Sequence, residues 1–125
     1  MNKKLLTQSL WIIFLLFVVH TVLTWFAIYW IYPWTDNAVH IIAGFAVGLW
    51  PIAFYDPTVL GEWSKRGFLR RLSMVLFVAI VGIVWEFTER RLGLSRPFVT
   101  SLLDAQMDVM ATIFGSFFSY LYVRR

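Results

Sequence analysis

Apolar residues fall into four long runs along the chain, separated by short polar or charged stretches. The runs cover about 10–32, 38–55, 72–92 and 98–123. The first contains no charged residue and is long enough for a helix to cross a hydrocarbon core about 30 Å thick. With their flanking residues, the runs predict helices over about 8–32, 36–55, 69–92 and 98–123.

The connections between these runs are short, apart from the polar segment DPTVLGEWSKRGFLRR between the second and the third. Short connections place consecutive helices side by side and antiparallel. The predicted fold is therefore all-α, a polytopic membrane protein in which four transmembrane helices form one bundle. A single domain over residues 1–125 is expected.

The composition supports a lipid environment. Of the 125 residues, 60% are hydrophobic and only 14% are charged, whereas a soluble domain has about 25% charged residues. The net charge of +4 is no sign of a nucleic-acid partner, because the basic residues lie at the ends of the apolar runs, as membrane anchors do. The absence of cysteine excludes disulfides and thiolate chemistry.

The first apolar run follows Lys3 and Lys4, as the apolar part of a signal peptide would. The sequence TWFAIYWIYPW after it offers no cleavage site of the small-x-small kind. The run is therefore expected to be a retained membrane anchor.

The distribution of Lys and Arg predicts the orientation. With a cytoplasmic N-terminus, the cytoplasmic parts hold eight basic residues, namely Lys3, Lys4, Lys65, Arg66, Arg70, Arg71, Arg124 and Arg125. The outer parts hold three, namely Arg90, Arg91 and Arg96. Cytoplasmic segments are richer in Lys and Arg, so both termini are predicted to be cytoplasmic. The aromatic residues Trp25, Tyr29, Trp30, Tyr32 and Trp34 would then form a belt at the outer interface.

Three ionisable residues fall at nearly one depth in this topology. Glu86 is 15 residues from Arg71, about 22 Å along a helix, and Asp108 is 16 residues from Arg124, about 24 Å. His40 lies about 6 Å below the outer edge at which its helix starts. Each of these residues has an acidic neighbour about one helical turn closer to the outer surface. These neighbours are Asp36, Glu89 and Asp104, and they form a second layer. Both layers of ionisable residues would lie near the outer face of the membrane.

Helical spacing also places each pair on one face. Asp36 and His40, and likewise Asp104 and Asp108, are four residues apart, and Glu86 and Glu89 are three apart. Below each pair the same face carries small residues: Gly44 and Gly48; Ala79 and Gly82; Ala111, Thr112, Gly115 and Ser119. Small residues mark faces along which membrane helices pack closely. The three pairs are therefore expected to point into the bundle.

Five carboxylates and one imidazole in a shared space would carry a charge near −5 if ionised. Arg90, four residues after Glu86, could compensate part of it. A bound cation is the other compensator, and oxygen ligands with one imidazole suit Mg²⁺, Mn²⁺, Fe²⁺ or Zn²⁺. The predicted ligands are Asp36, His40, Glu86, Asp104 and Asp108. The Glu-x-x-His signature of di-metal bundles is absent.

Three segments resemble the VanZ-like integral membrane proteins, and especially the small YjdF-type inner-membrane branch. They are TDNAVHIIAGF, VGIVWEFTER and RPFVTSLLDAQMDVMATIFGS, and the resemblance covers about residues 36–120. The positions that match are Asp36, His40, Gly82, Glu86, Asp104, Gln106, Asp108 and Gly115. Thr112 stands where many relatives have Asn, and the chain is shorter than typical members of that branch. The resemblance implies a bacterial cytoplasmic membrane protein and no particular reaction.

Most of these residues also have a structural interpretation. Asp36 could be a helix N-cap, His40 a hydrogen-bonded bundle residue, and Glu89 an interfacial partner of Arg. The helix dipole would stabilise the Asp104 carboxylate near the N-terminus of its helix. Arg96 could anchor the chain at the membrane interface or pair with Asp104. His20 and Thr24 are expected to donate hydrogen bonds between helices. Glu86 and Asp108 have the strongest functional interpretation, because little water reaches their depth.

Three classes of function are compatible with this pattern. The first is a metal-dependent membrane hydrolase or transferase acting on a lipid-linked or amphiphilic substrate at the outer leaflet, with Glu86 or Glu89 as base and Arg96 and Arg90 holding an anionic head group. The second is cation or proton transport, and the third is a noncatalytic membrane component with a structural polar cluster. We favour a protein that binds a divalent metal ion, with no organic cofactor expected.

Overall fold

The computed structural model of the protein describes residues 1–54, 65–92 and 102–123. These residues form helices and no strand. The helices are α1 (Lys3–Trp25), α2 (Ile28–Ile31), α3 (Trp34–Phe54), α5 (Lys65–Leu92) and α6 (Leu102–Val123). The predicted all-α class is confirmed. Three of the helices, namely α1, α3 and the part of α5 over Gly67–Leu92, are long and apolar enough to cross a membrane.

The first predicted helix, over about 8–32, is interrupted. Helix α1 ends at Trp25, and the N–H groups of Phe26 and Ala27 bond back to the carbonyls of Val22 and Thr24. Ala27 then takes a left-handed conformation with φ 56° and ψ 27°, which costs a non-glycine residue roughly 1–2 kcal/mol. The boundary at residue 32 was therefore wrong, because the chain turns at Ala27 and continues as the one-turn helix α2.

The other predicted boundaries differ less. Helix α3 begins at Trp34, directly after Pro33, so Asp36 lies in its first turn and not at the N-cap. A carboxylate in that turn still benefits from the helix dipole. Helix α5 begins four residues before the predicted residue 69, and the predicted start of the last helix at residue 98 lies outside the described residues.

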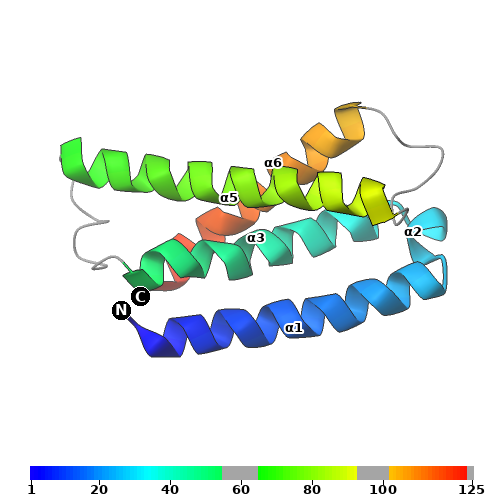
Figure 1. The fold of residues 1–125 in the computed structure, drawn as a ribbon, viewed down its shortest axis with the longest axis horizontal. Helices are drawn as coiled ribbons and strands as arrows, with labels where there is room; N and C mark the ends of the chain where they lie inside the picture. The colour runs from blue at the N-terminus through cyan, green and yellow to red at the C-terminus, as the bar shows by residue number, and fades with distance from the viewer. Residues whose placement is uncertain (55–64, 93–101, 124–125) are drawn as a thin grey trace.

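The long helices alternate in direction, as short connections predict. The Asn2 N–H donates to the Ala53 carbonyl at 2.7 Å, and the Gln8 side chain donates to the Tyr122 hydroxyl at 3.3 Å. These bonds gather the start of α1 and the ends of α3 and α6 at one end of the molecule, where α5 also begins (Figure 1). Helix α3 lies at the centre and packs on α1, α5 and α6.

The closest packing is between α3 and α6, through glycine. A Cβ atom on Gly44 would run into the backbone of Thr112, and one on Gly115 would run into the backbone carbonyl of Ile41. A Cβ atom on Gly48 would run into the Ser119 hydroxyl and crowd Ser116. Membrane helices commonly use small residues to bring backbones together. This close contact therefore fixes the relative positions of α3 and α6 residues that lie one or two helical turns from it.

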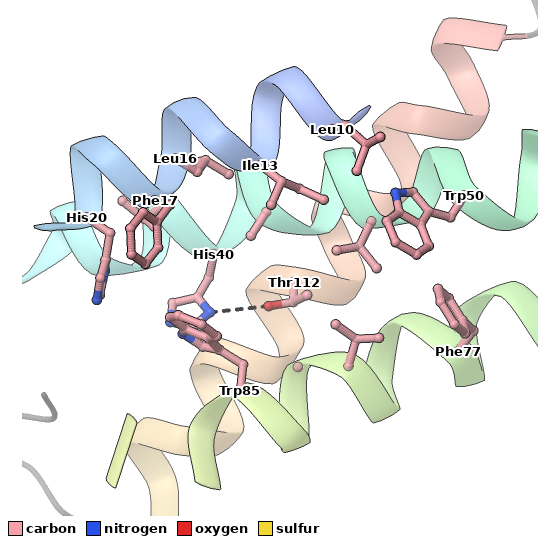
Figure 2. A pocket seen from close by; sticks show the side chains of 15 residues that line it. Leu10, Ile13, Leu16, Phe17, His20, His40, Trp50, Phe77, Trp85 and Thr112 are labelled. Atoms are coloured by element: carbon pink, nitrogen blue, oxygen red, sulfur yellow. Dashed lines mark hydrogen bonds between the residues drawn. The ribbon is translucent and has the colours of Figure 1, made fainter. Parts of the chain in front are cut away.

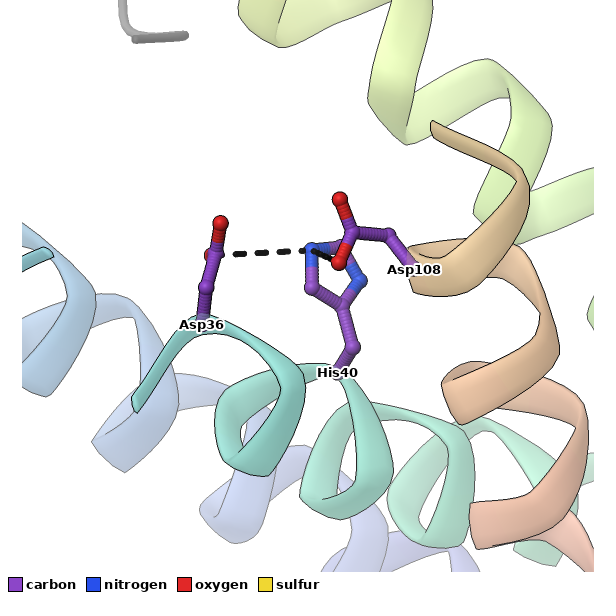
Figure 3. A group of neighbouring side chains, drawn as sticks. All are labelled: Asp36, His40 and Asp108. Carbon is purple, nitrogen blue, oxygen red and sulfur yellow. Dashed lines mark ion pairs between the residues drawn. The ribbon is translucent and has the colours of Figure 1, made fainter. Parts of the chain in front are cut away.

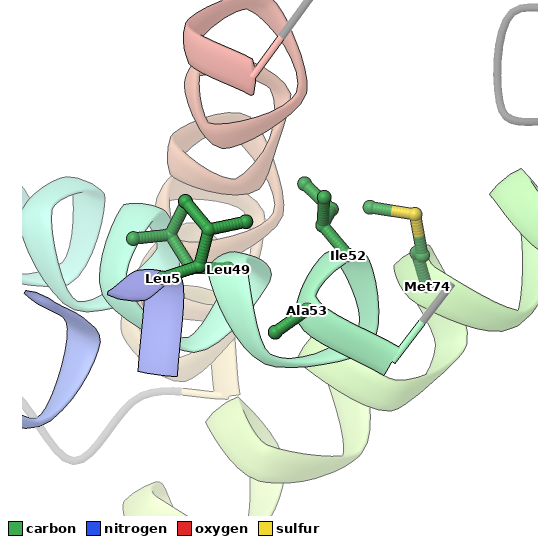
Figure 4. Packing of buried hydrophobic residues seen from close by; sticks show 5 residues of the cluster. All are labelled: Leu5, Leu49, Ile52, Ala53 and Met74. Carbon is green, nitrogen blue, oxygen red and sulfur yellow. The ribbon is translucent and has the colours of Figure 1, made fainter. Parts of the chain in front are cut away.

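Polar and apolar residues are distributed as a lipid solvent requires. A small apolar cluster of Leu5, Leu49, Ile52, Ala53 and Met74 lies where α1, α3 and α5 meet (Figure 4). The buried polar residues are Ser9, His40, Glu89, Asp108, Thr112, Ser116 and Ser119. Large side chains such as Trp11, Phe14 and Phe117 are more than half exposed. Apolar surface of this extent is rare on a soluble monomer.

Candidate functional site

His40 is the centre of a cluster of acidic residues drawn from three helices. Its ring is buried in the bundle, with 4% of the residue exposed. The Nε2 atom lies 3.6 Å from Oε1 of Glu86 on α5, 3.8 Å from Oδ1 of Asp36 on α3 and 3.9 Å from Oδ1 of Asp108 on α6. Figure 3 shows that Asp36 and Asp108 both approach the same nitrogen of the imidazole. The structure thus brings together the residues to which helix counting assigned one depth.

Helical spacing explains how each side chain reaches this point. Asp36 and His40 are one turn apart on α3, so the carboxylate and the ring lie on the same face of the helix. Asp108 lies one turn before Thr112 on the face of α6 that packs against α3. Glu86 comes from the part of α5 that follows Gly82, where α5 packs against Thr112. Only 12% of the Glu86 side chain is exposed.

Thr112 determines which nitrogen of His40 carries a hydrogen. Its hydroxyl donates to the Asp108 carbonyl at 2.8 Å, so its single hydrogen is already used. The same oxygen lies 3.3 Å from His40 Nδ1 and can only accept from it. The hydrogen-bond network therefore assigns the hydrogen to Nδ1. In the neutral ring, Nε2 then presents a lone pair to the carboxylates.

The distances around Nε2 suit a shared cation better than direct hydrogen bonds. They exceed the 2.7–3.2 Å range of an N–H···O bond. Two ligand atoms held about 2.1 Å from one ion lie roughly 3.0–3.4 Å apart at octahedral to tetrahedral angles. A contraction of a few tenths of an ångström would therefore bring each of these carboxylate oxygens and Nε2 to the separation of two ligands on one ion.

Two overlapping groups of side chains could hold a metal ion. One is Asp36, His40 and Asp108, and the other is His40, Glu86 and Glu89; in each group the ligand atoms lie within 4.8 Å of one another. Among the described residues, Glu86 Oε1 is buried without a hydrogen-bond partner. A buried acceptor of this kind is costly unless a charge or donor meets it, which a cation beside His40 would do.

A second imidazole–carboxylate pair lies beside the first. His20 on α1 places Nε2 3.3 Å from Oε1 of Glu89, and its Nδ1 lies 2.8 Å from the Tyr29 hydroxyl. The His20 ring also meets the edge of Trp85, with 5.7 Å between centroids. His20 was expected to serve as an interhelical hydrogen-bond donor, and the structure gives it an acidic partner on α5.

Tyr29 was not foreseen as part of the site. The sequence grouped it with the aromatic belt, but it is 6% exposed, whereas Trp25 is 83% exposed and Trp30 is 52% exposed. The turn at Ala27 carries Tyr29 back over α1 and brings its hydroxyl to His20. No residue pattern distinguishes it from its aromatic neighbours, so only the turn reveals its position.

The remaining predicted site residues lie at or beyond the edge of the cluster. Asp104 is partly buried in the first turn of α6 and belongs to neither ligand group of the described residues. Arg90 is exposed on α5. Gln106, named above only as a match to the VanZ-like pattern, is exposed on α6. Arg96 lies outside the residues that the structure describes. The predicted metal ligands thus gather without Asp104.

No protein-family model matches the chain, and no curated protein or solved structure matches it. The resemblance to VanZ-like proteins therefore stays a hypothesis that rests on the three quoted segments. The chemistry of the side chains around His40 is the basis on which a function can be proposed.

Proposed function

We propose that this protein binds a divalent metal ion at His40, Asp36, Glu86 and Asp108. The observation that carries the proposal is the orientation of His40, whose Nδ1 faces the Thr112 hydroxyl while Nε2 faces three carboxylates. Metal-bound histidine commonly uses one ring nitrogen as the ligand and hydrogen-bonds through the other. Thr112 supplies this second interaction.

Charge favours the same conclusion. Asp36, Glu86 and Asp108 each lie within 4 Å of one imidazole, which can offset at most one of their negative charges. Charged groups removed from water need a compensating charge. A divalent ion would supply it, and a set of three carboxylates with one imidazole fits Mn²⁺, Fe²⁺ or Zn²⁺ as well as Mg²⁺.

The proposed setting is the cytoplasmic membrane of a bacterium, with four spanning helices and both termini in the cytoplasm. The lengths of the apolar helices α1, α3 and α5 support membrane spans. The orientation is supported by the basic residues, eight of which would be cytoplasmic and three outside. The VanZ-like motifs agree with this setting. Helix α6 would be the fourth span, because its polar residues Asp108 and Thr112 face inward and not lipid. The metal site would then lie near the outer face.

We also propose a chemistry for this site. A bound cation would polarise a phosphoryl or carbonyl group or activate water. Asp36, His40, Glu86 and Asp108 would hold the ion. Glu89, paired with His20, would take up a proton from the water. Arg90, exposed on α5 next to Glu89, would attract the anionic head group of a lipid-linked or amphiphilic substrate; Arg96 is the second candidate for this role.

Metal analysis of matched variants tests the proposal. Wild-type protein, purified in detergent without chelator and then equilibrated with Mn²⁺, is expected to hold about one ion per chain, measured by elemental analysis and electron paramagnetic resonance. Asp108→Asn should weaken binding at least tenfold, because loss of a residue that only orients a ligand already costs 10–100-fold. Asp104→Asn removes the same charge from the same helix outside the ligand groups and should leave binding unchanged.

Three results would overturn it. Wild-type protein that holds no ion under these conditions has no such site. Equal losses in Asp108→Asn and Asp104→Asn would show that only the overall negative charge attracts cations. Loss of thermal stability in Asp108→Asn, together with unchanged ion content, would assign the cluster a structural role instead.

A further inference from the structure

A cavity of about 500 Å³ begins at the histidines and extends along the helices. Its walls come from one face each of α1, α3 and α5, with Thr112 contributed by α6. Helices α1 and α5 both pack on α3 but make few contacts with each other. The cavity occupies the space between them, as Figure 2 shows. It lies within the usual 300–1,000 Å³ range of ligand sites.

The two ends of the cavity differ in chemistry. His20, His40 and Thr112 lie at one end, and Leu10, Trp50 and Phe77 lie at the other (Figure 2). Apart from the glycine Gly82, the side chains between these ends are aliphatic or aromatic. Apolar walls cannot satisfy a polar ligand along their length. A ligand that fits both regions is therefore an amphiphile with its polar group at the histidines.

The length of the cavity matches one hydrocarbon chain. Its lining runs from Leu10 to His20 on α1 and from His40 to Trp50 on α3. Ten residues of helix correspond to about 15 Å. An extended chain advances roughly 1.2 Å per bond, so the space accommodates about twelve bonds. Half of a hydrocarbon core about 30 Å thick is also about 15 Å, so a lipid tail could enter sideways without changing its depth.

We propose that this cavity binds the hydrocarbon chain of a single-chain amphiphile whose anionic head group lies at the histidine end. The head-group part rests on the proposed function, because the carboxylates around His40 would repel an anion unless a cation neutralises them. The part of the proposal that concerns the hydrocarbon chain rests on the apolar walls of the cavity alone. The cavity is partly open, and entry between α1 and α5 requires no separation of α3 from α6.

A titration with alkyl phosphates of different length tests this inference. Octyl, tetradecyl and eicosyl phosphate are added to Mn²⁺-loaded protein in a nonionic detergent, and bound ligand is counted by native mass spectrometry. Wild-type protein should bind one tetradecyl phosphate at least tenfold more tightly than either of the others. Val81→Phe, which adds bulk to the cavity wall, should reduce this binding at least tenfold. Ile80→Phe, at an exposed neighbouring position, should not.

The results separate this inference from the proposed function. If Val81→Phe retains Mn²⁺ but loses tetradecyl phosphate, the cavity is the binding site in a folded protein. If wild-type protein holds no cation yet still selects tetradecyl phosphate, and Val81→Phe removes that selection, the metal proposal fails and the chain site stands. If the three phosphates bind equally, or both phenylalanine variants bind as wild type does, the inference is wrong whatever the ion content.

Discussion

The Thr112 hydroxyl lies 3.3 Å from Nδ1 of His40 and at the same time donates to the carbonyl of Asp108. One hydroxyl thus connects the central imidazole to the backbone of the helix that supplies an acidic partner. The arrangement holds the ring so that Nε2 faces Asp36, Glu86 and Asp108.

Replacing Thr112 should weaken metal binding without removing a ligand. Thr112→Val keeps the shape of the side chain but loses the acceptor for Nδ1, so the His40 ring is free to change its tautomer and orientation. Loss of such a partner typically costs 10–100-fold in affinity. A Mn²⁺ titration followed by electron paramagnetic resonance measures the change. Thr112→Ser keeps the hydroxyl and should bind within a few-fold of wild type; equal losses in both variants would contradict the assigned role.

Acid should release the ion. Metal-bound imidazole and carboxylates must be deprotonated, so protons compete with the metal. Mn²⁺ affinity is therefore expected to fall steadily as the pH is lowered from about 8 to about 5, the interval in which histidine commonly titrates. Equilibrium titrations at several pH values measure this dependence, with circular dichroism at each pH to verify the helices. A flat profile with intact helices would exclude His40 as a ligand.

His20 and Glu89 should be energetically coupled. Each single variant, His20→Gln or Glu89→Gln, leaves the other partner of the 3.3 Å pair behind. In a double-mutant cycle, the free energies of unfolding should depart from additivity by about 0.5–3 kcal/mol. Reversible unfolding in mixed micelles provides the measurement. Thr21→Val, at the exposed position next to His20, is the control and should combine additively with Glu89→Gln; the same coupling there would contradict a direct pair.

The glycine contact between α3 and α6 should tolerate no added methyl group. Gly115→Ala would push Cβ against the Ile41 carbonyl, and overpacking of this kind costs about 1–3 kcal/mol. A lower midpoint of thermal unfolding and weaker Mn²⁺ binding are expected together, because α6 also carries Asp108. Gly82→Ala is the matched control, since its Cβ would make ordinary contacts of 3.6–3.7 Å with Thr112. Comparable destabilisation in the two variants would show that the close contact is unimportant.

The meeting of His40, Glu86 and Asp108 could be predicted because it follows from helical geometry alone. The rise of 1.5 Å per residue, counted from a charged residue at the helix end, gives the depth of each side chain in the membrane. A spacing of three or four residues shows which side chains share one face of a helix. The small residues Gly44 and Gly115 indicated in the same way which faces pack closely. None of these inferences required knowledge of a particular side-chain conformation.

The interruption at Ala27 and the role of Tyr29 could not be predicted in this way. A left-handed alanine has no distinguishing sequence signal, because glycine, asparagine and aspartate are the residues that usually mark this conformation. Without the turn, Tyr29 looks like one more interfacial aromatic residue. Thr112 was identified as a small residue on a packing face and as a position where many VanZ-like proteins have Asn. Its hydrogen bond to His40 could not be predicted, because it depends on where two helices cross.

The contact at Gly44 and Gly115 has a mechanical consequence for the ion. Asp108 is four residues from Thr112, whose backbone meets Gly44, so it lies about 6 Å beyond the contact, and a pivot of about 10° there displaces it by about 1 Å. Its oxygen is 3.9 Å from His40 Nε2, and a shift of that size decides whether both atoms can reach one ion. A change of detergent or bilayer thickness that tilts α6 will therefore alter how strongly the ion is held, although no ligand residue has been replaced.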